Sequence, residues 1–267
     1  MPALALLLQL FAVAAYAGTA ALGLRERRQG QTRTSRRLVL CGLLAVNLHA
    51  AGYLLKGWGL SGPELHFFAA LSLVALGMAV VTLGDGLLRR VNALHVAVMP
   101  LAALAVLPHA LLPAGAPISL GWQIQLHAWL ALLAYAVISV AAVLALMLWL
   151  QERSLRQRRL QSSLQGMPPL VQVESLLFRF LAAGFGLLSL ALLSGVVFVE
   201  DLLGQHLAHK TVLSLLAWAV LAALLFGRHR FGWRGRRAVR LTLLAMALLL
   251  LAFFGSKFVL ELLLQRA

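Results

Sequence analysis

Eight long runs of apolar residues, separated by short polar segments, make up most of the chain. A helix needs about 20 mainly apolar residues to cross the hydrocarbon core of a bilayer, and in lipid it satisfies its own backbone hydrogen bonds. The pattern therefore predicts an all-α, polytopic membrane bundle of about eight transmembrane helices. We place them near residues 3–24, 38–60, 66–88, 93–112, 122–150, 175–199, 207–227 and 238–264.

The basic residues lie between alternate apolar runs. If the eight spans alternate in direction, 19 of the 23 Lys and Arg residues fall on one side, in Arg25 to Arg37, Arg89 to Arg90, Arg153 to Arg179 and Arg228 to Arg240. Segments rich in Lys and Arg stay in the cytoplasm, so both termini are expected outside. The first apolar run has no basic residue before it, and we expect a transmembrane helix there rather than a cleaved signal peptide.

Composition excludes several classes of protein. The chain has 62% hydrophobic and 12% charged residues, which is unlike a soluble domain. Its net charge of +15 comes from separate clusters rather than one continuous surface, so no nucleic acid partner is expected. Cys41 is the only cysteine, which excludes an internal disulfide and a CxxCH haem-attachment motif. No serine elbow, P-loop or GxGxxG motif is present, and we expect no enzyme activity. With no internal repeat evident, residues 1–267 are predicted to form a single membrane domain.

Histidines are concentrated at the predicted outer ends of the spans. Five of the eight lie there, and neutral imidazole is a common ligand of haem iron, zinc and copper. The five are His66, His109, His127, His206 and His209. His127 is the main candidate, and Tyr135, eight residues later, is expected on the same helix face. The alternative is that His127 and its tryptophan neighbours only anchor the helix at the membrane interface.

Two of these five histidines form a possible metal pair. His206 and His209 are three residues apart, so they share one side of a helix start. A zinc site would need further ligands, for which Glu200 and Asp201 are candidates. The alternative for both histidines is a solvated loop.

Two spans carry charged or polar residues that are costly against lipid. His49, Tyr53 and Lys56 form a stripe that is expected to face the bundle interior, with His49 either a ligand or a packed, hydrogen-bonded side chain. Lys257 and Glu261 have the i,i+4 spacing of a helical pair, and Glu200 or Asp201 could instead neutralise the lysine. The basic, aromatic loop 227–237 suits anionic lipid headgroups, although topology alone accounts for its charge.

Three blocks of sequence resemble a known family. The blocks are LHAWLALLAYA (126–136), the segment 194–237 with SGVVFVEDLLGQHLAHKTVLSLLAW and GRHRFGWRGRRA, and FGSKFVLE (254–261). They are similar to the integral membrane cytochrome c assembly superfamily that includes CcsA, CcmC and HemX, and most similar to its YpjD-type branch. The resemblance covers about 122–264, whereas the spans in 1–121 agree only in hydrophobic pattern.

The resemblance implies haem binding at the outer face of the inner membrane and a role in cytochrome c biogenesis. His127 falls at the family's first outer histidine, and His229 aligns with a family histidine at the end of the following span. The loop 200–209 takes the place of the tryptophan-rich WWD segment but contains no tryptophan. The stretch 255–257 stands where a second outer histidine is expected.

We therefore expect a multi-pass inner membrane protein that handles haem. The candidate cofactor-binding residues are His127, His209, His206, His49 and His229, with His127 and His209 as metal ligands. Expected partners are membrane lipids, haem and another membrane or cytochrome biogenesis protein. The alternatives are an ion transporter or an accessory subunit of a membrane transport complex, using Lys257, Glu261, Glu200 and Asp201, or a purely structural partner.

Overall fold

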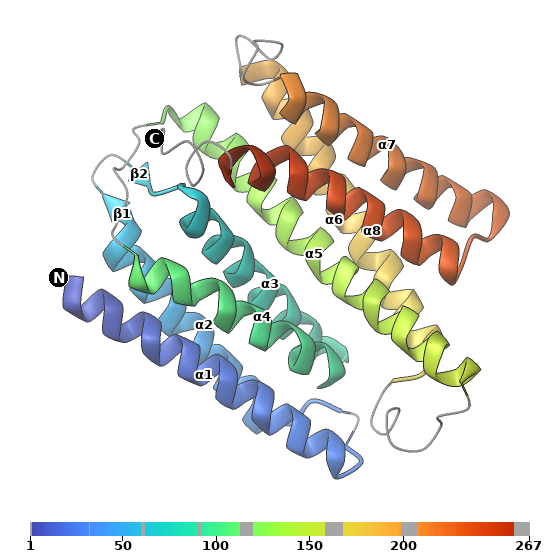
Figure 1. The fold of residues 1–267 in the computed structure, drawn as a ribbon, viewed down its shortest axis with the longest axis horizontal. Helices are drawn as coiled ribbons and strands as arrows, with labels where there is room; N and C mark the ends of the chain where they lie inside the picture. Colours follow the sequence, from blue (N-terminus) through green and yellow to red (C-terminus); the bar gives the residue numbers. More distant parts are fainter. Residues whose placement is uncertain are drawn as a thin grey trace. The chain divides into compact units, whose positions relative to one another are not determined.

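The computed structural model describes residues 2–31, 33–59, 62–89, 92–112, 120–157, 168–198 and 208–258. Within these residues, eight helices are long and apolar enough to cross a membrane, which confirms the predicted spans (Figure 1). The helices are α1 (Pro2–Arg28), α2 (Arg36–Gly57), α3 (Phe67–Arg89), α4 (Asn92–Leu111), α5 (Trp122–Arg156), α6 (Leu170–Phe198), α7 (Ala208–Phe231) and α8 (Arg236–Leu250).

Some bounds differ from the predicted ones. Helix α5 continues six residues past the predicted span and α6 begins five residues before it, which shortens the predicted connector 150–174. Apart from Ser154, the six added residues of α5 are Gln, Glu, Arg and Leu, which are good helix formers that need no lipid. A π-helical turn, η1 (Leu251–Gly255), follows α8, and two short strands, β1 (Trp58–Gly59) and β2 (Gly62–Pro63), pair antiparallel after α2.

The chain divides into two compact units. Unit 1 contains Met1–Ser119 and Gln151–Leu170, and unit 2 contains Leu120–Leu150 and Val171–Ala267. Each unit is described separately below. The prediction of one membrane domain over 1–267 stays a prediction.

Unit 1 is built around α1 to α4. Helix α1 packs against α2 and α4, and α3 packs against α2 and α4. The buried core between them consists mainly of alanine, with Tyr16, Leu83, Met99 and Val106 as the larger members. Small side chains let helix backbones approach closely, which is how membrane helices gain packing contacts without a hydrophobic driving force.

Unit 2 is built around α5 to α8. Gly184 of α6 gives room to Ile138 of α5, since an added Cβ would lie 2.6 Å from the Ile138 side chain. Tyr135 of α5 donates its hydroxyl to the carbonyl of Leu249 in α8 at 2.6 Å. The α6–α7 contact includes Trp218, whose ring stacks on Phe185 at a centroid distance of 5.4 Å. Side-chain contacts therefore hold α5 to α8 and α6 to α7.

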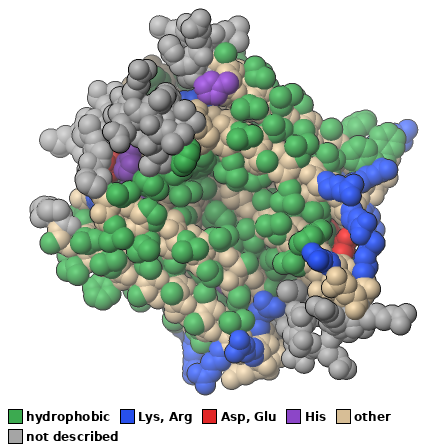
Figure 2. Space-filling view, in the orientation of Figure 1, with side chains coloured by type: hydrophobic (Ala, Val, Ile, Leu, Met, Phe, Trp, Pro, Cys, Tyr) green, Lys and Arg blue, Asp and Glu red, His purple; other side chains and the backbone are tan. Residues whose placement is uncertain are grey.

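The surface carries the pattern expected of a protein in lipid. Many large apolar side chains of the helices are exposed, including Phe11, Leu104, Leu193 and Phe226 at 60–66%. Apolar side chains cover most of the face in Figure 2, and Lys and Arg gather near helix ends. Exposure of this extent is stable when lipid rather than water surrounds the helices.

Candidate functional site

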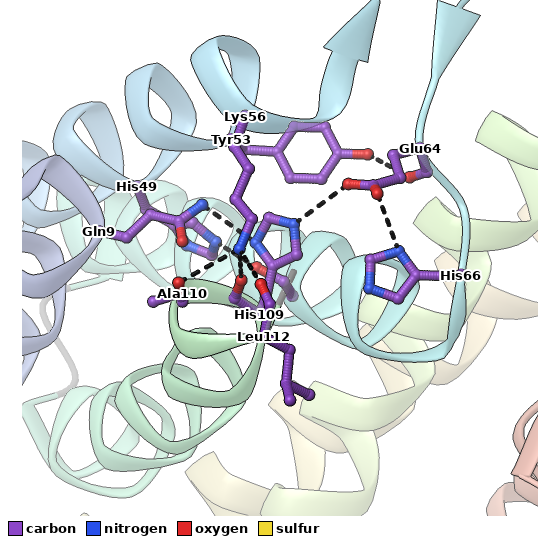
Figure 3. Close-up of polar contacts among 10 residues, drawn as sticks. Gln9, His49, Tyr53, Lys56, Glu64, His66, His109, Ala110 and Leu112 are labelled. Carbon is purple, nitrogen blue, oxygen red and sulfur yellow. Dashed lines mark hydrogen bonds and ion pairs between the residues drawn. The ribbon is translucent and has the colours of Figure 1, made fainter. Parts of the chain in front are cut away.

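Unit 1 contains a buried cluster of polar side chains near the end of α4 (Figure 3). Its centre is Glu64, which follows β2 and whose side chain is 3% exposed. One carboxylate oxygen lies 3.5 Å from Nδ1 of His66, and the other lies 3.8 Å from Nε2 of His109. His109 is 1% exposed. A carboxylate from the loop before α3 is thus placed between two imidazoles.

Side chains from several elements of unit 1 contact the imidazole of His109. The side-chain amide of Gln9 donates to Nδ1 of His109 at 3.0 Å. Since an amide nitrogen cannot accept, the ring proton of neutral His109 lies on Nε2, which faces Glu64. The ring of Tyr53 stacks on the imidazole at 5.4 Å, and its hydroxyl donates to the backbone carbonyl of Glu64 at 2.5 Å. Helices α1, α2 and α4 therefore meet at one histidine.

Lys56 closes the same end of unit 1. Its ammonium group donates to the carbonyls of His109, Ala110 and Leu112, the last two at 3.2 and 2.6 Å. These carbonyls lie at the C-terminus of α4, where they have no partner within the helix and where a cation is favoured. The polar stripe predicted on α2 is thus used in packing, and the burial of Tyr53 and His49 confirms that it faces inward.

His49 lies deeper in unit 1 and is fully buried. Its Nε2 pairs with the hydroxyl of Ser72 at 2.7 Å, and its Nδ1 pairs with the hydroxyl of Tyr16 at 3.2 Å. Both ring nitrogens have partners, which is the packed alternative that the sequence left open. In this arrangement His49 has no lone pair for a ligand.

A cavity of about 220 Å³ lies in unit 2, with His127 in its wall. Its lining is mainly apolar, from α5, α6, α7 and η1, and includes Leu188, Val196, Leu215 and Phe253. Polar groups enter from Lys210, Thr211 and Ser214 in the first turns of α7, and from Tyr135. The prediction that His127 and Tyr135 share one face is confirmed, because both line the cavity.

The imidazole of His127 is fixed through one nitrogen. Nδ1 lies 2.9 Å from the carbonyl oxygen of Ala191 and 3.1 Å from the hydroxyl oxygen of Ser194. A carbonyl only accepts, so the proton lies on Nδ1 and the lone pair lies on Nε2. No described residue pairs with Nε2. A metal-ligating histidine in proteins usually has this same arrangement, with its other nitrogen donating to a carbonyl.

Gly195 makes room for this imidazole. A Cβ at this position would lie 3.1 Å from Cε1 of His127, which is closer than nine in ten Cβ contacts in proteins. Gly186, in the same helix, has nothing within 4 Å of such a Cβ. The glycine at 195 therefore has a local role that the glycine at 186 does not share.

The other predicted residues lie away from this cavity or outside the described part of the chain. His209 is exposed in the first turn of α7 and does not line the cavity, although Lys210 does. His229 is exposed in the last turn of α7, roughly 30 Å along the helix from its start. Lys257 lies 5.6 Å from the ring centre of Phe253. His206, Glu200, Asp201 and Glu261 lie outside the described residues, so the predicted pairing of His206 with His209 and of Glu261 with Lys257 stays a prediction.

Within the described residues, no group of three or more His, Cys, Asp or Glu side chains is arranged to hold a metal ion. Sequence reasoning placed His66 and His109 among the outer histidines but did not identify Glu64 or Gln9 as their partners. The signal available was the presence of Gln9 and Glu64 in otherwise apolar surroundings. Their sequence separation from His109 left the pairing to the fold.

Comparison with known proteins gives one matching family and several relatives. The model of the family described as cytochrome C assembly protein matches residues 39–264, which extends beyond the region 122–264 that resembles it by motif. No solved structure matches the chain.

Among relatives, the inner membrane protein YpjD of Escherichia coli (strain K12) is 36% identical over 137 residues, which is 51% of this chain and 52% of that protein. Protein HemX of Brevibacillus brevis is 30% identical over 106 residues, or 39% of each chain. The cytochrome c biogenesis protein CcsA of Prochlorococcus marinus (strain MIT 9303) is 40% identical over 68 residues, covering 25% of this chain and 21% of that protein. The chain spans about half the length of the first of these curated relatives.

Proposed function

Because the chain belongs to the cytochrome c assembly protein family and is a multi-pass inner membrane protein, we propose that it binds haem through His127 at the cavity of unit 2. Family membership supports a role related to cytochrome c biogenesis, and the CcsA and HemX relatives agree with it. The observation that carries the haem proposal is the state of His127. Its Nδ1 is bound to a backbone carbonyl, which leaves Nε2 to ligate iron.

The cavity residues fit haem in their chemistry. An apolar wall with one neutral imidazole matches the donor and the surroundings that a haem iron takes in proteins. Lys210, Thr211 and Ser214 offer polar groups in the first turns of α7, where the anionic edge of a porphyrin would be stabilised. Bound haem would supply the iron and its redox chemistry, while this chain would bind, orient and shield it.

The size of the cavity limits how much of the ligand is enclosed. Its volume of about 220 Å³ is below the roughly 300–1,000 Å³ typical of sites that enclose a small molecule. Only part of a porphyrin would lie inside the wall. A partly enclosed cofactor suits a protein that holds haem for another protein rather than one that retains it for catalysis.

A haem titration of purified protein tests the proposal. Absorption spectra of the native chain, His127→Ala and His229→Ala in detergent would be compared, with size-exclusion chromatography to confirm folding. We expect a stoichiometric Soret band in the native chain and in His229→Ala, and its loss in His127→Ala. Equal haem binding by all three proteins would overturn the proposal. His209→Ala tests the predicted second ligand, and an unchanged spectrum would assign the iron a single histidine from this chain.

A second candidate function, transport of a cation or proton, is favoured by Glu64. Both of its carboxylate oxygens are buried without a hydrogen bond from any described residue, and two histidines stand beside it. Ionisable groups inside a membrane bundle are costly and commonly mark ion paths. Proteoliposomes that carry the native chain or Glu64→Gln would be compared for proton and cation flux. Equal flux in both, or none in either, would remove this candidate.

A further inference from the structure

A second cavity lies at the opposite end of α7 and α8 from the His127 site. It has a volume of about 480 Å³ and is lined by Leu146 and Trp149 of α5 and by Arg236, Val239, Arg240 and Leu243 of α8. The four α8 residues are spaced three and four apart and so form one stripe. Arg236 begins this stripe, Arg240 lies one turn further along beside Val239, and Leu243 continues the stripe into the span.

The arginines around this cavity differ in whether they are paired. Arg228 and Arg234 both bind the carboxylate of Glu174, at 2.8 and 3.0 Å. Arg237 lies over the ring of Trp233 at 5.7 Å. Arg236 and Arg240 are exposed, and no described residue forms an ion pair or hydrogen bond with either of them. The two guanidinium groups that line the cavity thus keep their charge available for a ligand.

Two unpaired arginines beside an apolar wall favour a ligand that has an anionic group and an apolar body. A guanidinium offers paired N–H donors that match the oxygens of a phosphate. The first turns of α8 add unpaired backbone N–H groups and the positive end of the helix dipole, and no side chain caps them. Leu146 and Trp149 are 45% and 41% exposed and extend the site along α5. Free phosphate would leave that apolar wall unused.

We propose that this cavity, the α5–α8 lipid site, binds an anionic phospholipid. Its phosphate is held by Arg236 and Arg240, and one acyl chain lies along Leu146, Val239 and Leu243. Trp149 lies at headgroup level, where tryptophan is enriched in membrane proteins. Basic pockets between membrane helices recognise anionic headgroups in this way. The site is independent of haem, since all six of its residues are distinct from the lining of the His127 cavity.

Lipid retention in matched variants tests the proposal. The double variant Arg236→Gln/Arg240→Gln would be compared with Arg230→Gln/Arg237→Gln, which removes the same charge from the same end of the unit but from residues that do not line the cavity. Native mass spectrometry of each protein in detergent would count bound phosphatidylglycerol and phosphatidylcholine. We expect the native chain and the control to retain phosphatidylglycerol. The cavity variant should bind it roughly twenty-five-fold more weakly, or about fivefold for each arginine.

Three outcomes would overturn the α5–α8 lipid site. Equal losses in both double variants would assign the effect to overall charge. Equal retention of phosphatidylglycerol and phosphatidylcholine by the native chain would remove the anionic selectivity. Displacement of the lipid by inorganic phosphate at comparable concentration would show a free-anion site, whereas weaker lipid binding in Leu243→Ser with the arginines intact would support the acyl-chain contact.

Discussion

The two units use histidine in opposite ways. In unit 1, His49 and His109 are buried, and three of their four ring nitrogens bind side chains of neighbouring helices. The fourth, Nε2 of His109, lies 3.8 Å from the carboxylate of Glu64 in the loop before α3. In unit 2, His127 is half-buried, one nitrogen is held by a backbone carbonyl and the other has no partner among the described residues. An imidazole with both nitrogens engaged joins helices, and one with a single nitrogen engaged is positioned for a ligand. Partner number, more than burial, separates the two roles.

The largest effect expected from this comparison is a loss of stability in His109→Ala. The substitution removes the stack on Tyr53 and the contact with Gln9, and it leaves Glu64 buried beside one imidazole fewer. We expect the free energy of unfolding to fall by about 3 kcal/mol, as for a buried pair that loses one partner. Thermal unfolding in detergent measures it. His127→Ala is the control, and a similar loss of stability there would contradict the division of roles.

The features that the sequence predicts are those that depend on residues close together in the chain. The eight spans follow from apolar runs of membrane length, a local property of sequence, and all eight are confirmed. The inward face of His49 and Tyr53 follows from helical spacing. The partners of these side chains are distant in sequence, such as Gln9 for His109, and no local pattern specifies them. The π-helical turn after Leu250 likewise has no sequence signal.

A second prediction concerns affinity rather than stability. Gly195→Ala places a methyl group 3.1 Å from Cε1 of His127, so the imidazole must move by a few tenths of an ångström, which disturbs its bond to the carbonyl of Ala191. We expect roughly tenfold weaker haem binding, the lower range for disturbing the support of a metal-ligating histidine. Gly186→Ala is the matched control because its methyl group meets nothing within 4 Å. The haem titration measures the affinity of both variants. Equal haem affinities of Gly195→Ala and Gly186→Ala would mean that the position of His127 does not determine haem affinity.

A third prediction tests whether His49 stabilises the packing of α2 against α1 and α3. Tyr16→Phe and Ser72→Ala each remove one hydrogen bond from the buried ring. Each is expected to lower the free energy of unfolding by about 0.5–1 kcal/mol and to leave haem affinity unchanged. The same denaturation assay measures the first quantity. A change of haem affinity in either variant would show that the two units are coupled.

The smallest effect is expected from Ser194→Ala. The hydroxyl shares Nδ1 of His127 with the Ala191 carbonyl, and the carbonyl bond remains after the substitution. Haem affinity should change by less than about threefold, since a shared hydrogen bond contributes roughly 0.5 kcal/mol. The titration curve again supplies the value. A loss as large as that of Gly195→Ala would assign the ring proton to the serine contact instead.

The alanine-rich core of unit 1 sets which inherited changes the protein tolerates. Soluble cores suffer most from lost volume, because each deleted methylene leaves a cavity. Where Ala12, Ala45, Ala79 and Ala102 let helices meet, little volume remains to be lost, and a gain of volume forces backbones apart. Mutational drift in this unit is therefore restricted in one direction. In homologous chains we expect glycine or serine to replace alanine at these positions. Leucine should be excluded there, although it is well suited to a lipid environment.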